Sequence, residues 1–256
     1  MEAGLHISIS AEPLTEVGGL VITNADLSSV IISMLLILLA VAVRLNLTNN
    51  HRPQGLQNAA EWVMESLYNL TQSVTNSRVK THTFFPLIAG FFLFILVNNW
   101  VSILPGVGTI GINRPASQLH GNEQTVFVPL FRAASADLNF TLALALLSVG
   151  LTQVFGIKYV GLSYFKKFVN FSNPIMFFVG LLEIISEVAK VLSFAFRLFG
   201  NIFAGEVLLA VTLFLVPLIV PLPFYGLEVF VGFIQALVFT MLSLVFFNMA
   251  TLSHEH

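Results

Sequence analysis

Five long runs of apolar residues divide the chain, which has 256 residues. They cover residues 27–45, 84–104, 138–157, 175–216 and 224–252. A helix that crosses a membrane needs roughly 20 mostly apolar residues, and each run is long enough for one crossing. The fourth run is about twice that length and has no proline before Pro217, so it predicts either two spans or one long, steeply tilted helix. The pattern predicts an all-α integral membrane protein with about five transmembrane helices, the last two long and tilted.

A different pattern occupies residues 53–77. Its apolar residues recur at steps of four and three, as on one face of a helix: Leu56, Ala60, Val63, Leu67, Leu70 and Val74. Pro53 suits the first turn of a helix. We expect an amphipathic helix that lies along the membrane surface. A helix on the soluble side that docks on another subunit explains the pattern equally well.

Lys and Arg are distributed unevenly between the connecting segments. The segments after the first and third runs carry Arg44, Arg52, Arg78, Lys80, Lys158, Lys166 and Lys167. The segment between the second and third runs carries only Arg114 and Arg132. Because such cations accumulate in cytoplasmic loops, we expect the N-terminus outside and, after five crossings, the C-terminus in the cytoplasm. This count also favours one long fourth helix over two.

The N-terminal segment, residues 1–26, contains acidic residues but no Lys or Arg. A secretory signal peptide begins with a basic segment, so we expect an outer N-terminal tail and no cleaved signal. It leads directly into the first run. We expect residues 1–256 to form a single membrane domain.

The composition excludes several other classes of protein. Hydrophobic residues make up 56% of the chain and charged residues only 9%, far from the usual composition of soluble domains. Basic and acidic residues are nearly balanced, at 11 and 13, so nothing suggests binding to nucleic acid. There is no cysteine and no G-x-x-x-x-G-K-[ST] loop for nucleotide phosphates. We expect no cofactor, no metal site and no catalytic residue, and we interpret His254 and His256 as part of a solvated tail.

Ionisable residues in the last two runs are candidates for function, because a charge in a membrane-spanning helix is costly. They are Glu183, Glu187, Lys190, Arg197, Glu206 and Glu228. Glu183, Lys190 and Arg197 are seven residues apart and share one face of a helix. Glu206 is nine residues beyond Arg197, on nearly the opposite face. Glu228 and Gln235 again share a face.

Each candidate also has a structural interpretation. Glu183, Glu187 and Lys190 could form a self-neutralising cluster whose side chains extend to the membrane surface, and this explanation is as good as a role in an ion path. Arg197 could form a structural ion pair within the chain. Because arginine keeps its proton in proteins, it could also supply the fixed positive charge that a proton-translocation barrier requires.

Sequence motifs connect these residues with a known family. Residues 193–206 read SFAFRLFGNIFAGE and residues 233–240 read FIQALVFT. Three further segments match: ITNAD at 22–26, LVNN at 96–99 and SADLN at 135–139. Over essentially its whole length the chain resembles subunit a of bacterial-type F-type ATP synthases, the stator subunit of the membrane sector.

The resemblance implies a role for each candidate residue. Arg197 resembles the essential arginine that faces the carboxylates of the rotating ring of c subunits, and Asn201 neighbours it. Glu206, Glu228 and Gln235, with Asn99 near them, match positions of a half-channel open to the outside, where we expect Glu206 and Glu228 to lie close together. Glu183 matches an acid of the inner half-channel. The chain departs from the family in carrying Glu at both 206 and 228, and a hydroxyl at Ser102 where some relatives carry an acid.

The implied function is proton translocation coupled to rotation of the c ring. The implied partners are the c ring, the peripheral-stalk b subunits, the F1 sector that performs the ATP chemistry, and membrane lipids. The implied location is a bacterial plasma (inner) membrane, or an organellar inner membrane. The coupling ion, proton or sodium, depends mainly on the ring. The alternative is a secondary transporter or ion channel that works alone; a purely structural anchor does not explain so many ionisable residues.

Overall fold

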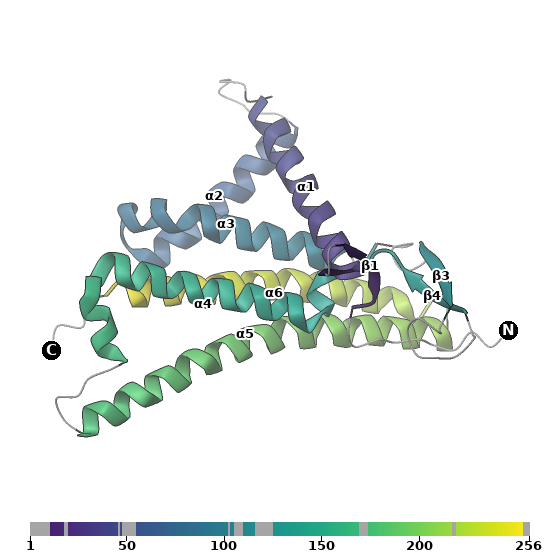
Figure 1. The fold of residues 1–256 in the computed structure, drawn as a ribbon. Helices are drawn as coiled ribbons and strands as arrows, with labels where there is room; N and C mark the ends of the chain where they lie inside the picture. Colours follow the sequence, from purple (N-terminus) through teal and green to yellow (C-terminus); the bar gives the residue numbers. More distant parts are fainter. Residues whose placement is uncertain are drawn as a thin grey trace. The chain divides into compact units, whose positions relative to one another are not determined.

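A computed structural model describes residues 11–17, 20–45, 47, 55–101, 103–104, 110–115, 125–168, 174–216 and 219–252. Most of these residues are helical (Figure 1). The α-helices are α1 (Asn24–Leu45), α2 (Leu56–Thr75), α3 (Arg78–Val101), α4 (Leu138–Val160), α5 (Pro174–Leu215) and α6 (Pro221–Ala250). All of them except α2 are long and apolar enough to cross a membrane. The prediction of an all-α membrane protein with five spanning helices is confirmed.

The fourth apolar run forms one helix rather than two. α5 has 42 residues and continues through Gly200 and Gly205, as the unbroken ribbon in Figure 1 shows. At a rise of 1.5 Å per residue such a helix is roughly 60 Å long, about twice the hydrocarbon thickness of a bilayer. A helix of this length fits in a membrane only when it is tilted or extends beyond it. Its tilt stays a prediction.

The amphipathic segment forms α2, which ends where Asn76 adopts a left-handed conformation and its N–H donates to the carbonyl of Gln72. α3 then begins at Arg78, before the apolar run itself. Its first turn is stabilised by Thr81, whose hydroxyl lies 2.6 Å from that of Thr75. The two helices therefore form a hairpin with a very short connection.

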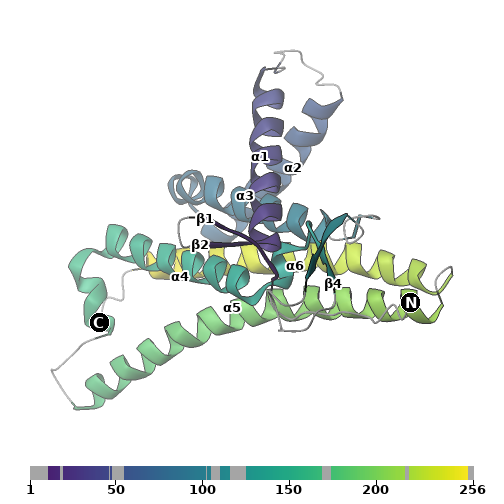
Figure 2. The same ribbon diagram turned by 45° about the vertical axis from the view of Figure 1, so that its right-hand side comes forward.

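Among the described residues, two β-hairpins occur outside the helices, and the apolar pattern did not predict them. β1 (Pro13–Val17) pairs with β2 (Leu20–Thr23), and β3 (Gly111–Pro115) pairs with β4 (Thr125–Pro129), both antiparallel. Figure 2 shows the first pair at the start of α1. Strands this short carry too few alternating residues to stand out in a sequence dominated by apolar runs.

The start of α1 is fixed by a reciprocal pair of side chains. The backbone N–H of Asp26 donates to the hydroxyl of Thr23, and the Asp26 carboxylate accepts from the Thr23 N–H at 3.1 Å and from its hydroxyl at 2.8 Å. This arrangement is a capping box, which satisfies N–H groups that the first turn of a helix leaves without partners.

The chain divides into two compact units. The first comprises Met1–Ile37, Phe94–Thr141 and Arg197–Gln235. Here the buried Asn24 side chain donates to the carbonyl of Pro129, and the N–H of Arg132 donates to the hydroxyl of Ser28. Small residues that are almost fully buried follow Arg132: Ala133, Ala134, Ser135 and Ala136. Their burial shows that this segment lies in the interior of the unit.

The second unit comprises Leu38–Leu93, Leu142–Phe196 and Ala236–His256. Three aromatic rings form its centre, one each from α3, α4 and α6. The centroid of the Phe155 ring lies 4.9 Å from that of Phe84 and 5.1 Å from that of Phe247. The hydroxyls of Ser148 on α4 and Ser243 on α6 lie 2.7 Å apart and are buried. Aromatic packing and a buried hydrogen bond therefore join the same helices.

Candidate functional site

Several candidate residues of the first unit are connected through contacts among α3, α5 and α6. Together with Arg132 they form what we call the Arg132 group: Asn99, Arg132, Glu206, Glu228 and Gln235. Arg132 is 7% exposed, and its Nη2 lies 3.5 Å from Oε2 of Glu206 on α5. The Glu206 side chain is 39% exposed. The ion pair thus joins a buried cation in the segment before α4 to an acid that reaches the surface.

Arg132 also influences Asp137, which lies just before α4. Burial raises the pKa of Asp137 above its usual value, while the N–H of Asn139 and the charge of Arg132 act in the opposite direction. The Asn139 N–H donates to the Asp137 carboxylate at 3.2 Å, so Asp137 caps α4. Arg132 therefore acts on two acids, Glu206 of α5, which it contacts, and Asp137 of its own segment.

Glu228 on α6 is buried, and its carboxyl group packs directly against Gly205 of α5. A β-carbon at position 205 would overlap this carboxyl group. Glycine is therefore required for the observed approach. Since Gly205 precedes Glu206, the Glu228 carboxyl group of α6 lies beside the turn of α5 that carries Glu206.

Asn99 on α3 contributes a polar contact to α6. Its side-chain amide is almost fully buried and donates to the carbonyl of Gly232 at 3.0 Å. The neighbouring indole N–H of Trp100 donates to the carbonyl of Val229 at 3.1 Å. Gln235, half-buried, lies one helical turn beyond Gly232. Two hydrogen bonds thus hold the end of α3 against the part of α6 that carries Glu228 and Gln235.

Arg197 lies on an exposed face of α5. Its side chain is exposed, as are Gly200, Asn201 and Ala204, whereas Leu198 is buried on another face of the helix. The Asn201 amide donates to the carbonyl of Arg197 at 2.9 Å. Gly200, Asn201 and Ala204 are all much smaller than arginine, so a neighbouring helix can approach Arg197 closely.

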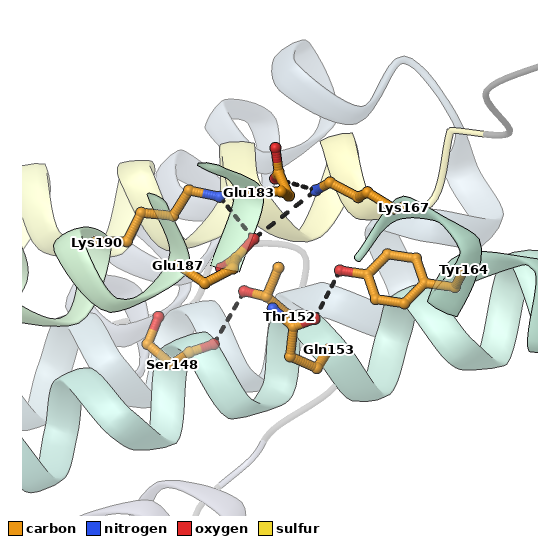
Figure 3. Close-up of polar contacts among 8 residues, drawn as sticks. All are labelled: Ser148, Thr152, Gln153, Tyr164, Lys167, Glu183, Glu187 and Lys190. Carbon is orange, nitrogen blue, oxygen red and sulfur yellow. Dashed lines mark hydrogen bonds and ion pairs between the residues drawn. The ribbon is translucent and has the colours of Figure 1, made fainter. Parts of the chain in front are cut away.

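Glu183 belongs to a second site, in the second unit. The Lys167 cluster comprises Lys167, Glu183, Glu187 and Lys190 (Figure 3). Lys167 Nζ lies 2.5 Å from Glu183 Oε1 and 3.8 Å from Glu187 Oε1, and Lys190 Nζ lies 2.8 Å from the same Glu187 oxygen. The four charges alternate in sign and sum to zero. Glu183 is therefore paired with the connecting segment, not with Lys190 on its own helix.

Two residues of these sites, Arg132 and Lys167, were not among the candidates that the sequence pattern indicated. Arg132 and Lys167 were interpreted only as loop cations that set the orientation of the chain. Their carboxylate partners are far away in sequence, so neither pair follows from helical spacing. The signal that could have found Arg132 is its place beside a run of small residues, which is typical of a segment packed in the interior.

Some expected positions lie outside the described residues, namely His254, His256 and Ser102. Within the described ranges no group of three or more His, Asp or Glu side chains could hold a metal ion. The two sites consist of carboxylates, amides and cations, which can bind and release protons and stabilise charge.

Comparison with known proteins connects this arrangement to one family. The family model described as "ATP synthase A chain" matches residues 27–248. ATP synthase subunit a 1 of Syntrophotalea carbinolica is 35% identical over 216 residues, which are 83% of this chain and 80% of that protein. ATP synthase subunit a of Campylobacter jejuni subsp. doylei is 33% identical over 222 residues, 85% of this chain and 87% of that protein.

A third relative, ATP synthase subunit a of Syntrophobacter fumaroxidans, is 35% identical over 208 residues, 80% of this chain and 74% of that protein. The matched region contains all five membrane-spanning helices nearly in full, together with both polar sites. The resemblance noted from the motifs is confirmed: this chain belongs to the ATP synthase A chain family, the family of ATP synthase subunit a.

Proposed function

We propose that this chain conducts protons through the membrane sector of an ATP synthase and couples their flow to rotation of a ring of c subunits. Its other partners are peripheral-stalk b subunits, membrane lipids and the F1 sector. The chain itself is not an enzyme, because the ATP chemistry belongs to F1. It forms a single membrane domain in a bacterial plasma membrane, with its N-terminus outside and its C-terminus in the cytoplasm.

The observation that carries this proposal is the exposed position of Arg197 on a long apolar helix. An arginine keeps its charge in any environment, and a charge facing lipid is costly. A surface that presents it among small residues is suited to a sliding partner with carboxylates, such as a c ring. The same charge favours the ionised form of a carboxylate that passes within a few ångströms.

The two polar sites supply the ends of the path. Protons enter from outside through Glu206, Glu228, Gln235 and Asn99, and leave toward the cytoplasm near Glu183. Moving one charge across the membrane field yields about 2.3 kcal/mol per 100 mV, but only when protons cannot pass straight through. The fixed positive charge of Arg197 opposes the direct passage of a proton and so prevents that leak. Asn201 orients the arginine segment through its bond to the Arg197 carbonyl.

Substitution of Arg197 tests the proposal. In membranes that contain the assembled complex, Arg197→Ala should abolish proton-driven ATP synthesis, since the fixed charge between the half-channels is lost. Arg197→Lys should also fail or nearly fail, because lysine is a compact charge that loses its proton more readily and lacks the planar guanidinium. The amount of assembled complex should stay normal, because the side chain is exposed and leaves no core cavity.

Arg44→Ala provides the matched control, since Arg44 is also an exposed arginine but lies in the last turn of α1. It should retain ATP synthesis. Full coupling in Arg197→Ala at normal abundance would contradict the proposal. Loss of assembly in Arg197→Ala, largely restored by Arg197→Lys, would instead indicate a structural ion pair.

A further inference from the structure

The Lys167 cluster has a feature that its sequence spacing does not predict. Glu183 and Glu187 lie one turn apart on α5, yet the cation between them comes from outside that helix. Lys167 is the last residue of the 3₁₀-helix η3 (Gly161–Lys167), in the connection between α4 and α5. Lys190 is paired with Glu187, and among the described side chains the cation in contact with Glu183 is Lys167 of this connection.

Close backbone contact brings the connection to α5. A β-carbon at Gly180 would overlap the backbone carbonyl of Phe168, the residue after η3. The absence of a side chain at this position lets the end of η3 lie directly on α5, one turn before Glu183. Figure 3 shows Lys167 extending from the connection toward both carboxylates.

The connection is also tied to α4. Tyr164 is 6% exposed, and its hydroxyl donates to Gln153 at 2.8 Å. Lys167 Nζ lies 5.8 Å from the centroid of the Tyr164 ring and 5.6 Å from that of Phe168, within the range of cation–π attraction. Two aromatic rings and two carboxylates therefore orient one ammonium group.

The two acids do not hold Lys167 equally. Its Nζ is 2.5 Å from Glu183 but 3.8 Å from Glu187, and Glu187 already accepts from Lys190 at 2.8 Å. The side chains are 28% exposed for Lys167 and Glu183 but 13% exposed for Glu187. The Glu183 end of the cluster is thus the end that exchanges with solvent more readily.

We propose that Lys167 is a positioning residue for the proton path, which holds the ionised Glu183 carboxylate at the exit and moves toward Glu187 when Glu183 takes up a proton. The proton comes from the path and is bound by a Glu183 oxygen. It then leaves to water, and Lys167 returns to the carboxylate. Lys167 Nζ lies 2.5 Å from Glu183 and 3.8 Å from Glu187, so this exchange requires the ammonium group to move by little more than an ångström. The inference rests on the proposed role of Glu183.

A double-mutant cycle on ATP-driven proton uptake, measured per assembled complex in inside-out vesicles, tests the inference. Lys167→Gln should lower the rate by up to about fivefold. This factor corresponds to the upper end of the range of energies measured for solvent-accessible ion pairs. Lys167→Arg should retain most of the rate, because it keeps the charge. Adding Lys167→Gln to Glu183→Gln should lower the rate no further, since the lysine acts through that acid.

Lys158→Gln is the control, because Lys158 is an exposed lysine in the last turn of α4; its rate should be unchanged. The inference is overturned if the rate is unchanged in Lys167→Gln, or if adding Lys167→Gln to Glu183→Gln lowers the rate by the same factor as in the wild-type chain. Either result leaves the role of Glu183 intact. An unchanged rate in Glu183→Gln overturns both. Failure of assembly in Lys167→Gln alone shows that the lysine is structural and also overturns the inference.

Discussion

The guanidinium group of Arg132 lies 3.5 Å from the carboxylate of Glu206 and is almost completely buried. A buried arginine requires compensation by acceptors, because removing its charge from water is costly. Glu206 supplies one of these acceptors from α5, and the backbone of Arg132 is held by Ser28 of α1. The pair therefore links the segment before α4 to the helix that carries Arg197.

The first prediction concerns this pair. Arg132→Met should lower the free energy of unfolding by about 1–2 kcal/mol, less than the 3–5 typical of a fully buried pair, because Glu206 is partly exposed and the distance is long. The double variant Arg132→Met/Glu206→Gln should be more stable than Arg132→Met alone, since no unpaired acid remains. Thermal unfolding of the detergent-solubilised complex measures both.

Arg44→Met is the control for the loss of an arginine charge, because Arg44 is exposed. It should leave the midpoint of unfolding nearly unchanged. Equal unfolding midpoints for Arg132→Met and for the double variant would show that an unpaired Glu206 carboxylate does not destabilise the protein.

The second prediction concerns Gly205. In Gly205→Ala the new β-carbon occupies the place of the Glu228 carboxyl group, which must move. Stability should change little, because a rotamer shift costs roughly 0.5–1.5 kcal/mol and alanine gains about 1 kcal/mol in helix propensity over glycine. Proton transport should fall roughly tenfold or more, because a displacement of about an ångström can cost that much.

Shortening the acid should partly restore transport in this variant. Gly205→Ala/Glu228→Asp should conduct protons faster than Gly205→Ala, since aspartate withdraws the carboxyl group from the β-carbon. Gly90→Ala is the matched control, because a β-carbon at Gly90 meets no atom within 4 Å. If Gly205→Ala conducts protons as well as Gly90→Ala, the position of the Glu228 carboxyl group has no role in transport.

The pattern of apolar and charged residues predicted much of the fold. It located the spanning helices, and the absence of proline in the fourth run together with the distribution of cations favoured the single helix that α5 forms. These features are local, because helix formation in a membrane follows from the length of an apolar run. Seven-residue spacing likewise placed Glu183 and Lys190 on one helix face.

The ion pairs were not predictable in the same way. Glu206 pairs with Arg132 and Glu183 pairs with Lys167, and both cations come from connecting segments. Such contacts depend on how the chain folds back, for which helical periodicity contains no information. The close approaches at Gly180 and Gly205 are equally invisible, since a glycine in an apolar run looks the same whether it faces lipid or a neighbouring segment.

The third prediction concerns Tyr164, which lies in η3, outside the spanning helices. Burial, reinforced by the charges of Glu187 and Glu183, raises the pKa of its hydroxyl from near 10 to about 12, although Gln153 acts in the opposite direction. The folded protein thus keeps a proton that the unfolded chain loses as pH rises from about 10 to about 12. The contribution of Tyr164 to stability is therefore complete below pH 10 and is lost over this interval.

Absorbance titration of tyrosinate checks this prediction, because the chain has only four tyrosines. Tyr164→Phe should remove the component that titrates near pH 12. It should also lower stability at neutral pH by about 1 kcal/mol, since the hydrogen bond to Gln153 is lost. Persistence of this component in Tyr164→Phe would contradict the assignment.

The fourth prediction compares two neighbouring asparagines of α3. Both Asn98 and Asn99 are buried, but their hydrogen bonds differ: Asn99 donates across to the carbonyl of Gly232 on α6, whereas Asn98 donates to the carbonyl of Phe94 within its own helix. Hydrogen bonds between helices in a membrane contribute about 0.6 kcal/mol on average and up to about 1.7. Asn99→Leu should therefore lower the unfolding midpoint of the complex.

Asn98→Leu should behave differently. The Oδ1 atom of Asn98 is buried and accepts no hydrogen bond from the part of the chain that the structure describes, so an apolar side chain of similar volume relieves a buried polar atom. The helix keeps its own backbone bonds, and the midpoint should stay the same or rise. Proton transport should fall in Asn99→Leu, because α6 loses a contact beside Glu228, and should persist in Asn98→Leu. A larger loss of stability and transport in Asn98→Leu than in Asn99→Leu would show that the contact between α3 and α6 does not position the acid.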